Sequence, residues 1–489
     1  MQRSHMKTFI AIVAGPLVGS LAFLLLQHLG TTQACMAGTV AWMAVWWITE
    51  AVPIPITSLL PIVLFPLFGI AELGATTAYY GKDVIFLFLG GFLLALGIER
   101  SGLHRRLALM IVARVGASPS RLVLGTLLAT GFLSMWINST AAVLVMLPIA
   151  LSLESHALGH QRFGLALSLA VAYGATIGGM ATPVGTPPNL VFMSLWKQQF
   201  PELPPIGFGQ WMLFGVPYAS LFLLFTWLLL TRVLYPMEGT TRVDRKALRE
   251  QLAALGRASR DELLAALVFT LTALLWITGD DIQISSSFTL HGWRSALGLK
   301  GLGDPAVAIV GGLFLFLIPS GTTEDKGDRR MLLDWEFAQG RIPWGVVLLI
   351  GSGFAIAGGI DASGLSATIG KALAGMYTGS QVLQVAAVGS GVTLLSELGS
   401  NTAVASLVLP IMASTATGWG MSPQSLMIPA TIAASCGFML PIASPMQAIV
   451  FTSGRMSVKQ MMRAGVWMDA VGVVLLVLLW WLLGTLVFG

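Results

Sequence analysis

Residues Thr393–Pro410 read TLLSELGSNTAVASLVLP, and this stretch decides how the whole chain is interpreted. Three small polar residues, Ser400–Thr402, lie at the middle of a long apolar segment, and one carboxylate, Glu397, precedes them. Such groups are costly in hydrocarbon unless they pair, hydrate or hold a ligand, so they indicate a functional site. A similar polar group, Asn138–Thr140, lies 262 residues earlier (position 400 against 138). We interpret the two groups as copies of one feature.

The composition is that of an integral membrane protein. Of the 489 residues, 55% are hydrophobic and 10% are charged, whereas a soluble domain carries about 25% charged residues. Alternating ten-residue strands with turns, typical of a transmembrane β-barrel, do not occur, so we predict an all-α membrane fold. The net charge of +5 comes mostly from Lys and Arg in loops, as membrane topology requires, and predicts no nucleic-acid partner. Cys35 and Cys436 predict neither a metal cluster nor a disulfide framework.

Many segments are long enough to cross a bilayer, which takes about 20 apolar residues in a helix. Two further stretches, 119–151 and 381–413, have about 33 residues each, too long for one helix and too short for two full crossings plus a turn. Each has a polar break near its middle, which is tolerated at membrane depth where protein or a water-filled cavity covers it. We therefore predict two re-entrant helical hairpins and about 11 transmembrane helices. The predicted spans are 8–28, 35–49, 53–72, 83–98, 163–192, 209–235, 261–279, 304–319, 345–360, 424–452 and 463–487.

The distribution of Lys and Arg predicts the orientation in the membrane. Loops 99–118, 236–260, 320–343 and 453–462 are rich in these residues, and the loops between them are poor. Because positively charged loops stay on the cytoplasmic side, the N-terminus is predicted to be cytoplasmic and the C-terminus outside. The predicted location is the cell inner (cytoplasmic) membrane, with membrane lipids around the protein. This bias would collapse if either hairpin were one ordinary span.

An internal repeat relates the two halves of the chain. Residues 92–103 resemble 354–365, and 147–149 resemble 409–411, at the same offset of 262. The loop after the first copy is rich in Arg and predicted inside, whereas the loop after the second holds only Lys371 and is predicted outside. The repeats therefore have opposite orientation, the arrangement in which transporters place a site at the membrane midplane.

Each hairpin is followed by a span that prolines interrupt. The sequences TPVGTPPN at 182–189 and LPIASPMQ at 440–447 lie within the spans 163–192 and 424–452. Two prolines four residues apart remove amide donors and clash with the preceding turn, so neither helix continues through them. Both spans are predicted to be broken helices whose free backbone groups face the hairpin tips.

Hydroxyls and amides at helix N-termini can hold an anion without a fixed cation. Two such tips suit a ligand with two anionic ends, and a cation held by hydroxyl, amide and carbonyl oxygens would compensate its charge. The structural alternative is hydrogen bonding between neighbouring helices, but recurrence at one offset favours the binding site. Glu397 is either a proton or cation site or a cap of a hairpin helix. Glu50 is interpreted as interfacial, and Ser352 lacks the His or Asp that a nucleophile would need.

At these residues the chain resembles the divalent anion:sodium symporter (DASS) family, relatives of sodium-coupled dicarboxylate and citrate transporters. The resemblance rests on the two tips, the two breaks and WWITEAVPIP at 46–55, and it covers nearly the whole chain. It implies a homodimer of elevator type, in which a transport domain moves against a scaffold. It also implies di- or tricarboxylate substrates, such as succinate, malate, fumarate and citrate, or sulfate in some branches.

The resemblance and the repeat together imply five regions, and each repeat holds one hairpin and one broken helix. The regions are N-terminal scaffold helices (1–82), transport-domain repeat 1 (83–208), scaffold helices with cytoplasmic loops (209–344), transport-domain repeat 2 (345–452) and a C-terminal scaffold helix (453–489).

The resemblance also implies site residues. The substrate would be bound by Asn138, Ser139, Thr140, Thr186, Pro187, Ser400, Asn401, Thr402, Ser444 and Pro445. Co-transported sodium ions would be bound by Ser134, Asn138, Ser139 and Gly185 in the first half, and by Ser396, Gly399, Asn401 and Ala443 in the second. Two places depart from the family pattern: the first tip reads Asn-Ser-Thr instead of Ser-Asn-Thr, and Met446–Gln447 replace Pro-Asn or Ala-Asn. These departures leave the coupling ion, the stoichiometry and the exact substrate open.

The leading hypothesis is a secondary active transporter that imports C4-dicarboxylates by sodium symport. The alternatives are a sodium-independent dicarboxylate exchanger and a sulfate or citrate carrier on the same fold. A channel would need a continuous polar pore, and an intramembrane hydrolase would need a Ser/His pair, paired aspartates or a zinc motif. The sequence offers none of these, so we predict a transporter and no enzyme.

Overall fold

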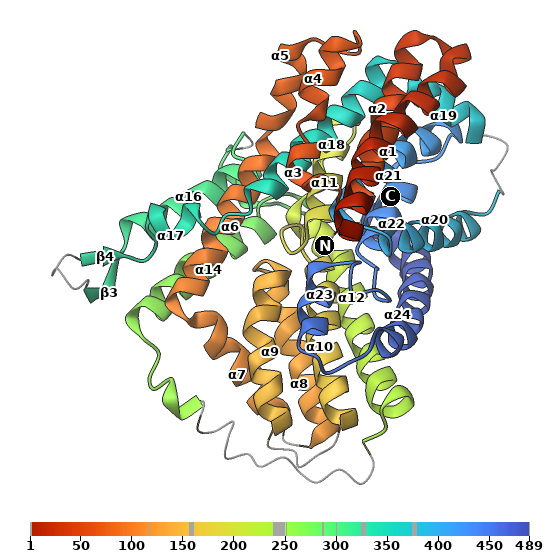
Figure 1. The fold of residues 1–489 in the computed structure, drawn as a ribbon. Coiled ribbons are helices and arrows are strands. Elements are labelled where there is room, and N and C mark those ends of the chain that lie inside the picture. The colour runs from red at the N-terminus through yellow and green to blue at the C-terminus, as the bar shows by residue number, and fades with distance from the viewer. Residues whose placement is uncertain are drawn as a thin grey trace.

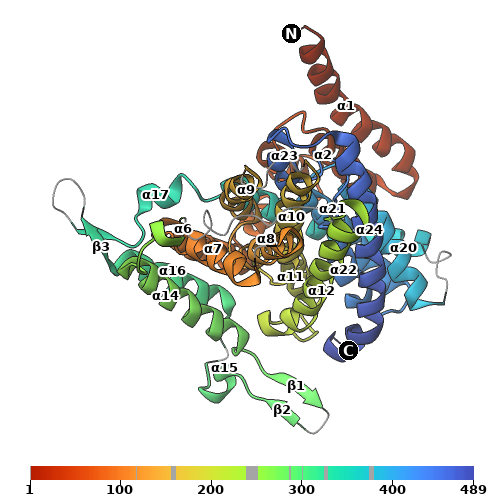
Figure 2. The ribbon, with the colours of Figure 1, turned by 90° about the horizontal axis from the view of Figure 1, so that it is seen from below.

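The chain folds almost entirely into helices (Figure 1), seen from below in Figure 2. The structure is a computed structural model that describes residues 2–116, 118–155, 161–237, 250, 252–285, 288–299, 301–323, 329–373 and 379–488. Part of the predicted cytoplasmic loop 236–260 therefore lies outside the described residues.

Two hairpins of short strands depart from the all-α prediction. Strand β1 (Ile282–Ser285) pairs with β2 (Phe288–Leu290), and β3 (Pro319–Thr323) pairs with β4 (Arg329–Met331), both antiparallel. Both hairpins lie in connections between helices. There, short runs such as Ile-Gln-Ile-Ser alternate β-branched and polar residues, which favours strand pairing.

One predicted span, 53–72, is wrong as a single helix. It contains two short helices, α3 (Ile54–Thr57) and α4 (Leu60–Leu67). Four prolines lie between positions 53 and 66, and each removes an amide donor and crowds the preceding turn. The neighbouring elements are α1 (Gln2–Leu26), η1 (Gln27–Leu29), α2 (Thr31–Thr49), α5 (Leu73–Ala78), η2 (Tyr79–Gly81), α6 (Asp83–Ser101) and α7 (Leu103–Val115).

Each predicted hairpin consists of two helices joined at its polar tip. The first hairpin is α8 (Pro119–Ser134) and α9 (Ser139–Ser155), and the second is α20 (Gln381–Ser396) and α21 (Asn401–Gly418). Serine side chains cap the starts of α8 and α20, because a hydroxyl oxygen satisfies an otherwise free amide of the first turn. The helices stop where the polar residues begin. Re-entry of these hairpins into a membrane stays a prediction.

The two proline-rich segments separate pairs of helices. Helix α10 (Gln161–Met180) ends before the first segment, and α11 (Pro187–Gln199) begins within it, at its second proline. In the second half, α22 (Gln424–Ala434) and α23 (Pro445–Thr452) are separated in the same way. Proline occupies the first position of α11 and of α23, where its missing amide hydrogen costs no helical hydrogen bond.

Helix α10 forms the centre of the larger core. All its residues from Phe163 to Met180 are buried, as is typical of a helix that is apolar all round. It packs against both helices of the first hairpin, and a Cβ atom at Gly178 would lie 2.1 Å from the carbonyl oxygen of Gly131. Only glycine therefore allows α8 and α10 to approach so closely.

The remaining elements surround these hairpins and broken helices. Helix α6 lies along α14 and α16 (Figures 1 and 2). The elements are α12 (Phe208–Leu228) with its π-helical end Leu229–Leu234, α14 (Arg260–Ile277), α15 (Trp293–Ala296), α16 (Asp304–Leu317), α17 (Trp335–Gln339), α18 (Trp344–Ala362), α19 (Leu365–Leu373), α24 (Val458–Leu479), a π-helical turn (Trp480–Gly484) and α25 (Thr485–Phe488).

In the part of the chain that the structure describes, six helices are long and apolar enough to cross a membrane by length and composition. Several other apolar helices, including α16, α20 and α22, are shorter. The chain is therefore suited to several crossings. The number of about 11 transmembrane helices, which came from segment lengths, stays a prediction.

Candidate functional site

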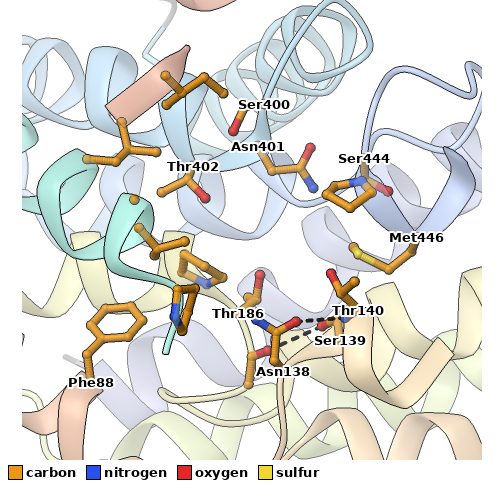
Figure 3. Close-up of a pocket in the computed structure, with 18 of the residues that line it drawn as sticks. Phe88, Asn138, Ser139, Thr140, Thr186, Ser400, Asn401, Thr402, Ser444 and Met446 are labelled. Atoms are coloured by element: carbon orange, nitrogen blue, oxygen red, sulfur yellow. Dashed lines mark hydrogen bonds between the residues drawn. The ribbon is translucent and has the colours of Figure 1, made fainter. Parts of the chain in front are cut away.

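The tips of the two hairpins face each other across one cavity of about 330 Å³ (Figure 3). Residues Ser400–Thr402 line one side and Asn138–Thr140 line the opposite side. All the residues that the sequence assigned to substrate line this cavity, together with Gly185. Its other lining residues, which sequence reasoning missed, are Ile54, Pro55, Phe88, Phe92, Val184, Pro343, Gly345, Val346, Leu349 and Met446. Six of them belong to apolar segments without a motif, whereas Ile54, Pro55, Val184 and Met446 lie in the motifs at 46–55, 182–189 and 440–447 but received no role.

Four helices begin at the wall of this cavity. The first residues of α9, α11, α21 and α23 all line it. A helix N-terminus carries a partial positive charge and free amide hydrogens, so it favours anions. None of the described residues that line the cavity is Asp, Glu, Lys or Arg. For an anion, the cavity therefore provides helix N-termini, hydroxyls and amides but no fixed cation.

At the first tip, three oxygen atoms lie close together, two from residues that line the cavity and one from Ser134 behind them. The hydroxyl oxygens of Ser134 and Ser139 are 2.7 Å apart, and Ser139 Oγ lies 3.3 Å from the carbonyl oxygen of Gly185. The Ser134 hydroxyl donates to the carbonyl oxygen of Ala175 at 2.6 Å. Asn138 has another role, because its Oδ1 accepts the amide hydrogen of Thr140 at 2.8 Å. The chemistry of the oxygens of Ser134, Ser139 and Gly185 suits a hard cation such as sodium.

The second tip repeats this arrangement with an amide in place of a hydroxyl. The Ser396 hydroxyl donates to Asn401 Oδ1 at 2.9 Å and also lies 2.5 Å from the carbonyl oxygen of Ala434. Ser396 and Asn401 are the counterparts of Ser134 and Ser139 at the offset of 262. The side-chain oxygen that meets the serine thus comes from a hydroxyl in one half and from an amide in the other.

Not every residue assigned to sodium lines the cavity. Ser134, Ser396, Gly399 and Ala443 lie outside its lining. The two serines are buried behind the tips. Gly399 lies against α2, since a Cβ there would be 3.4 Å from Ile48 Cα. Ala443 is buried near the second tip: a Cβ added at Gly437 would lie 3.2 Å from the Ala443 Cβ and 2.9 Å from the Ser396 carbonyl oxygen.

Buried side-chain amides hold both breaks in shape. Asn189 Nδ2 donates to the carbonyl oxygens of Gly179 at 3.3 Å and Thr182 at 2.8 Å, and Gln447 Nε2 donates to that of Gly437 at 2.9 Å. Unpaired carbonyl groups inside a protein are costly. These donors therefore stabilise the non-helical segments that follow α10 and α22. The sequence showed Asn189 and Gln447 in the motifs but gave no sign of these partners.

Of the two roles left open for Glu397, the structure bears on capping, and the proton or cation site stays a prediction. The Glu397 carboxylate accepts the amide hydrogens of Met439 at 2.8 Å and Leu440 at 2.9 Å. It therefore caps backbone of the second break and not a helix of its own hairpin. Asp469 of α24 adds a third contact of this kind, with Phe438. The first half uses a hydroxyl instead, because Thr182 donates to the carbonyl oxygen of Met135 at 2.5 Å.

Comparison with known proteins decides the family. The family described as "Citrate transporter" (CitMHS) matches residues 44–420 and 296–488. The chain belongs to this citrate transporter family. It is also 39% identical over 498 residues to the "Sodium-dependent dicarboxylate transporter SdcS" of Staphylococcus aureus strains MRSA252 and NCTC 8325, with 98% of this chain and 92% of each relative covered. The resemblance to sodium-coupled di- and tricarboxylate transporters is therefore confirmed, and the relatives in the citrate transporter family are transporters, not enzymes.

Two solved structures share the fold of this citrate transporter family member. The YdaH transporter of Alcanivorax borkumensis has a TM-score of 0.56 at 16% identity, covering 84% of this chain and 87% of that chain. MtrF of Neisseria gonorrhoeae has a TM-score of 0.55 at 14% identity, covering 83% and 82%. At such identities the likeness concerns the fold alone.

Proposed function

We propose that the chain imports C4-dicarboxylates, such as succinate, malate and fumarate, by sodium symport across the cell inner membrane. The observation that carries this proposal is the cavity between the two tips, where four helix N-termini meet and none of the described lining residues is charged. Its pseudo-symmetric ends match a ligand with a carboxylate at each end. The 39% identical relatives named as sodium-dependent dicarboxylate transporters support the same substrate class and coupling ion.

Sodium would compensate the charge of the substrate. The oxygens of Ser134, Ser139 and Gly185 at the first tip, and of Ser396 and Asn401 at the second, are hard ligands that lie close together. We infer that Asn138, Gly399 and Ala443 complete these two sites. A cation next to the cavity strengthens anion binding, because opposite charges attract strongly where water is excluded. Substrate and sodium would therefore bind cooperatively.

The experiment that tests this proposal is uptake of labelled succinate by purified protein in liposomes. We expect accumulation that requires an inward sodium gradient and that excess unlabelled malate or fumarate suppresses. Excess sulfate and citrate are the competitors that identify a different anion. Uptake that is equal with potassium in place of sodium would contradict sodium symport.

The second candidate, sodium-independent dicarboxylate exchange, is favoured by one feature of the first tip. There the Asn138 side chain is engaged with the Thr140 amide, and a hydroxyl replaces the amide that contacts the serine at the second tip. One weaker cation site would follow. Uptake driven by internal unlabelled succinate, without sodium on either side, would identify this exchanger.

For the mechanism we propose an elevator in a homodimer surrounded by membrane lipids. The moving domain would contain the two re-entrant hairpins and the two broken helices, with the N-terminus cytoplasmic and the C-terminus outside. Helix α6 lies along α14 and α16, which argues for counting it with the scaffold and starting the first moving repeat after the end of α6 at Ser101. Crosslinks between cysteines placed on a hairpin and on α16, with and without substrate, would test this motion.

A further inference from the structure

A second cavity adjoins the central one. Its volume is about 540 Å³, and we call it the vestibule. It runs from the first hairpin tip along α6 and α9 to the end of α6 at Glu99. Five residues line both cavities, namely Phe92, Asn138, Thr140, Pro343 and Val346. The two cavities therefore adjoin each other at the first hairpin tip, which we assign to substrate binding.

The walls of the vestibule are mainly apolar, and their only Lys or Arg in the described chain is Arg341. The other titratable lining residues are Glu99 and His104. Burial lowers the pKa of His104, so its ring is neutral near pH 7. Arg341 is thus the fixed positive charge on this wall. A dianion that passes an apolar wall loses hydration, and a nearby cation offsets part of that cost.

The guanidinium of Arg341 is held in orientation by its neighbours but keeps hydrogen-bond donors that no described residue uses. Its Cζ lies 3.9 Å from the centre of the Phe337 ring, and its Nε lies 3.7 Å from Glu99 Oε1, a loose ion pair. Among the described residues its side chain makes no hydrogen bond, and half of the side chain is exposed. A guanidinium that is held by stacking and keeps its terminal N–H groups free can bind a carboxylate through two parallel hydrogen bonds.

The support beneath this arginine is built from α6 and α17. Asp334 accepts the Phe337 amide hydrogen at 2.8 Å and pairs with the buried side chain of Arg100. The Arg100 guanidinium also lies 4.9 Å from the Phe337 ring centre. The ring that orients Arg341 is therefore fixed to the end of α6, beside the vestibule.

We propose that Arg341 is a transient docking point for a substrate carboxylate, between the central cavity and the protein surface beside Glu99. This proposal rests on the proposed function, because it assumes a dicarboxylate in the central cavity. The substrate would exchange the loose Glu99 contact for its own carboxylate on the way. Because the guanidinium is half exposed, the attraction is moderate, so the site speeds passage without trapping the anion.

Among the two outer cavities that the described residues line, the second repeat has none at its hairpin tip, which places the proposed route beside the first repeat. Asp361, the counterpart of Glu99 at the offset of 262, lines a separate cavity of about 560 Å³ with Lys371. That cavity reaches α21 only at Ala413–Gly418 and does not include the tip residues 400–402. Of these two outer cavities, therefore, the one beside Glu99 and Arg341 reaches a hairpin tip and the one beside Asp361 and Lys371 does not.

The test compares Arg341→Gln, Arg341→Lys and a matched control, Arg455→Gln, in liposomes. Arg455 is equally exposed and pairs with Glu154 at 3.3 Å, but it lines neither cavity. We expect Arg341→Gln to lower the initial rate of succinate transport about fivefold at low ionic strength and less than about twofold in concentrated choline chloride, because salt screens exposed charges. Arg341→Lys keeps the positive charge but lacks the two parallel N–H donors of the guanidinium, so its transport rate should lie between those of wild type and Arg341→Gln. The succinate concentration needed to stabilise the protein against heat should stay within about twofold of the wild-type value, since Arg341 does not line the central cavity.

Equal rates for Arg341→Gln, Arg455→Gln and wild type at low ionic strength would overturn the docking role. A loss of the same size at every ionic strength, with weaker stabilisation by succinate, would also overturn it, because it would indicate a damaged central cavity.

Glu99→Gln provides an independent test if Arg341→Gln does not fold. It should raise the rate about twofold at low ionic strength, and an unchanged or lower rate would count against the proposal. If the wild-type protein transports no succinate, the proposed function itself is refuted.

Discussion

Gln447 reaches across the second break to the carbonyl oxygen of Gly437, with its Nε2 at 2.9 Å. Asn189 makes the corresponding contact with Gly179 in the first break, and both pairs are related by the same offset of 258 (447 against 189, 437 against 179). Position 447 departs from the residue that is usual in the resembled family. The longer side chain nevertheless provides the same amide donor to the same carbonyl group. This departure therefore preserves the structure of the break.

Replacing Gln447 by Leu should destabilise the protein. The buried carbonyl group of Gly437 would lose its amide donor, and an unsatisfied buried polar group costs about 1–3 kcal/mol. We expect a lower melting temperature in detergent and a loss of transport, because the break lines the central cavity at Ser444 and Pro445. Gln447→Glu is the matched comparison, since it keeps the shape but removes the donor. A melting temperature for Gln447→Leu equal to that of wild type would contradict this role.

Asn401→Ala and Thr402→Ala should each abolish succinate transport while leaving the fold largely intact. Both residues line the central cavity at the first turn of α21, so their loss removes ligand contacts without opening the core. The measurement is uptake in liposomes, combined with size-exclusion chromatography of the purified variants. Transport near the wild-type rate in either variant would refute the site assignment. Exposed Leu394 of α20 does not line the cavity, and its replacement by Ala provides the control.

Ser134→Ala and Ser396→Ala should weaken the activation of transport by sodium. Each serine places its hydroxyl beside a tip residue, Ser139 or Asn401, behind the cavity wall. Removing one oxygen ligand should raise the sodium concentration for half-maximal transport about tenfold, which corresponds to about 1.4 kcal/mol. The succinate affinity at saturating sodium should change much less. An unchanged sodium response in both variants would place the cations elsewhere.

Glu397→Ala should be more damaging than Glu397→Gln. The alanine variant leaves the partly buried amides of Met439 and Leu440 without their acceptor, at a cost of up to about 1–3 kcal/mol each. Glutamine keeps one acceptor oxygen, so roughly half of that loss is expected. Thermal unfolding of both variants in detergent measures the difference. If alanine and glutamine destabilise equally, the contact of the carboxylate with the two amides does not explain the role of Glu397.

His104 should reduce stability at acidic pH. Burial lowers its pKa in the folded protein, although its ring contacts the carbonyl oxygen of Ile98 at 3.1 Å. In the unfolded chain the imidazole binds a proton below a pH of about 6.5. The unfolded state then holds more protons than the folded state, so the free energy of unfolding falls as the pH decreases through this range. His104→Gln should lose this component when melting temperatures are compared between pH 5 and 8, and an identical pH profile would contradict it.

The sequence alone determined the repeat, the polar tips and the proline-rich breaks. These features depend on local chemistry: a polar tripeptide interrupts an apolar run, and paired prolines cannot continue a helix. That is why helices stop at Ser134, Met180 and Ser396 as the patterns predicted within a few residues, whereas α22 stops at Ala434, six residues before the predicted break at 440–447.

Only the tertiary structure decided which groups those features meet. Nothing in the local sequence shows that Glu397 accepts amides from residues 439 and 440, that Gln447 reaches Gly437, or that Arg341 lies over Phe337 beside the vestibule. Such contacts join segments that are packed together by the whole fold, and a pattern along one segment does not encode its partners. The error at 53–72 has a different and local reason, because several prolines outweighed an apolar composition that alone predicted a span.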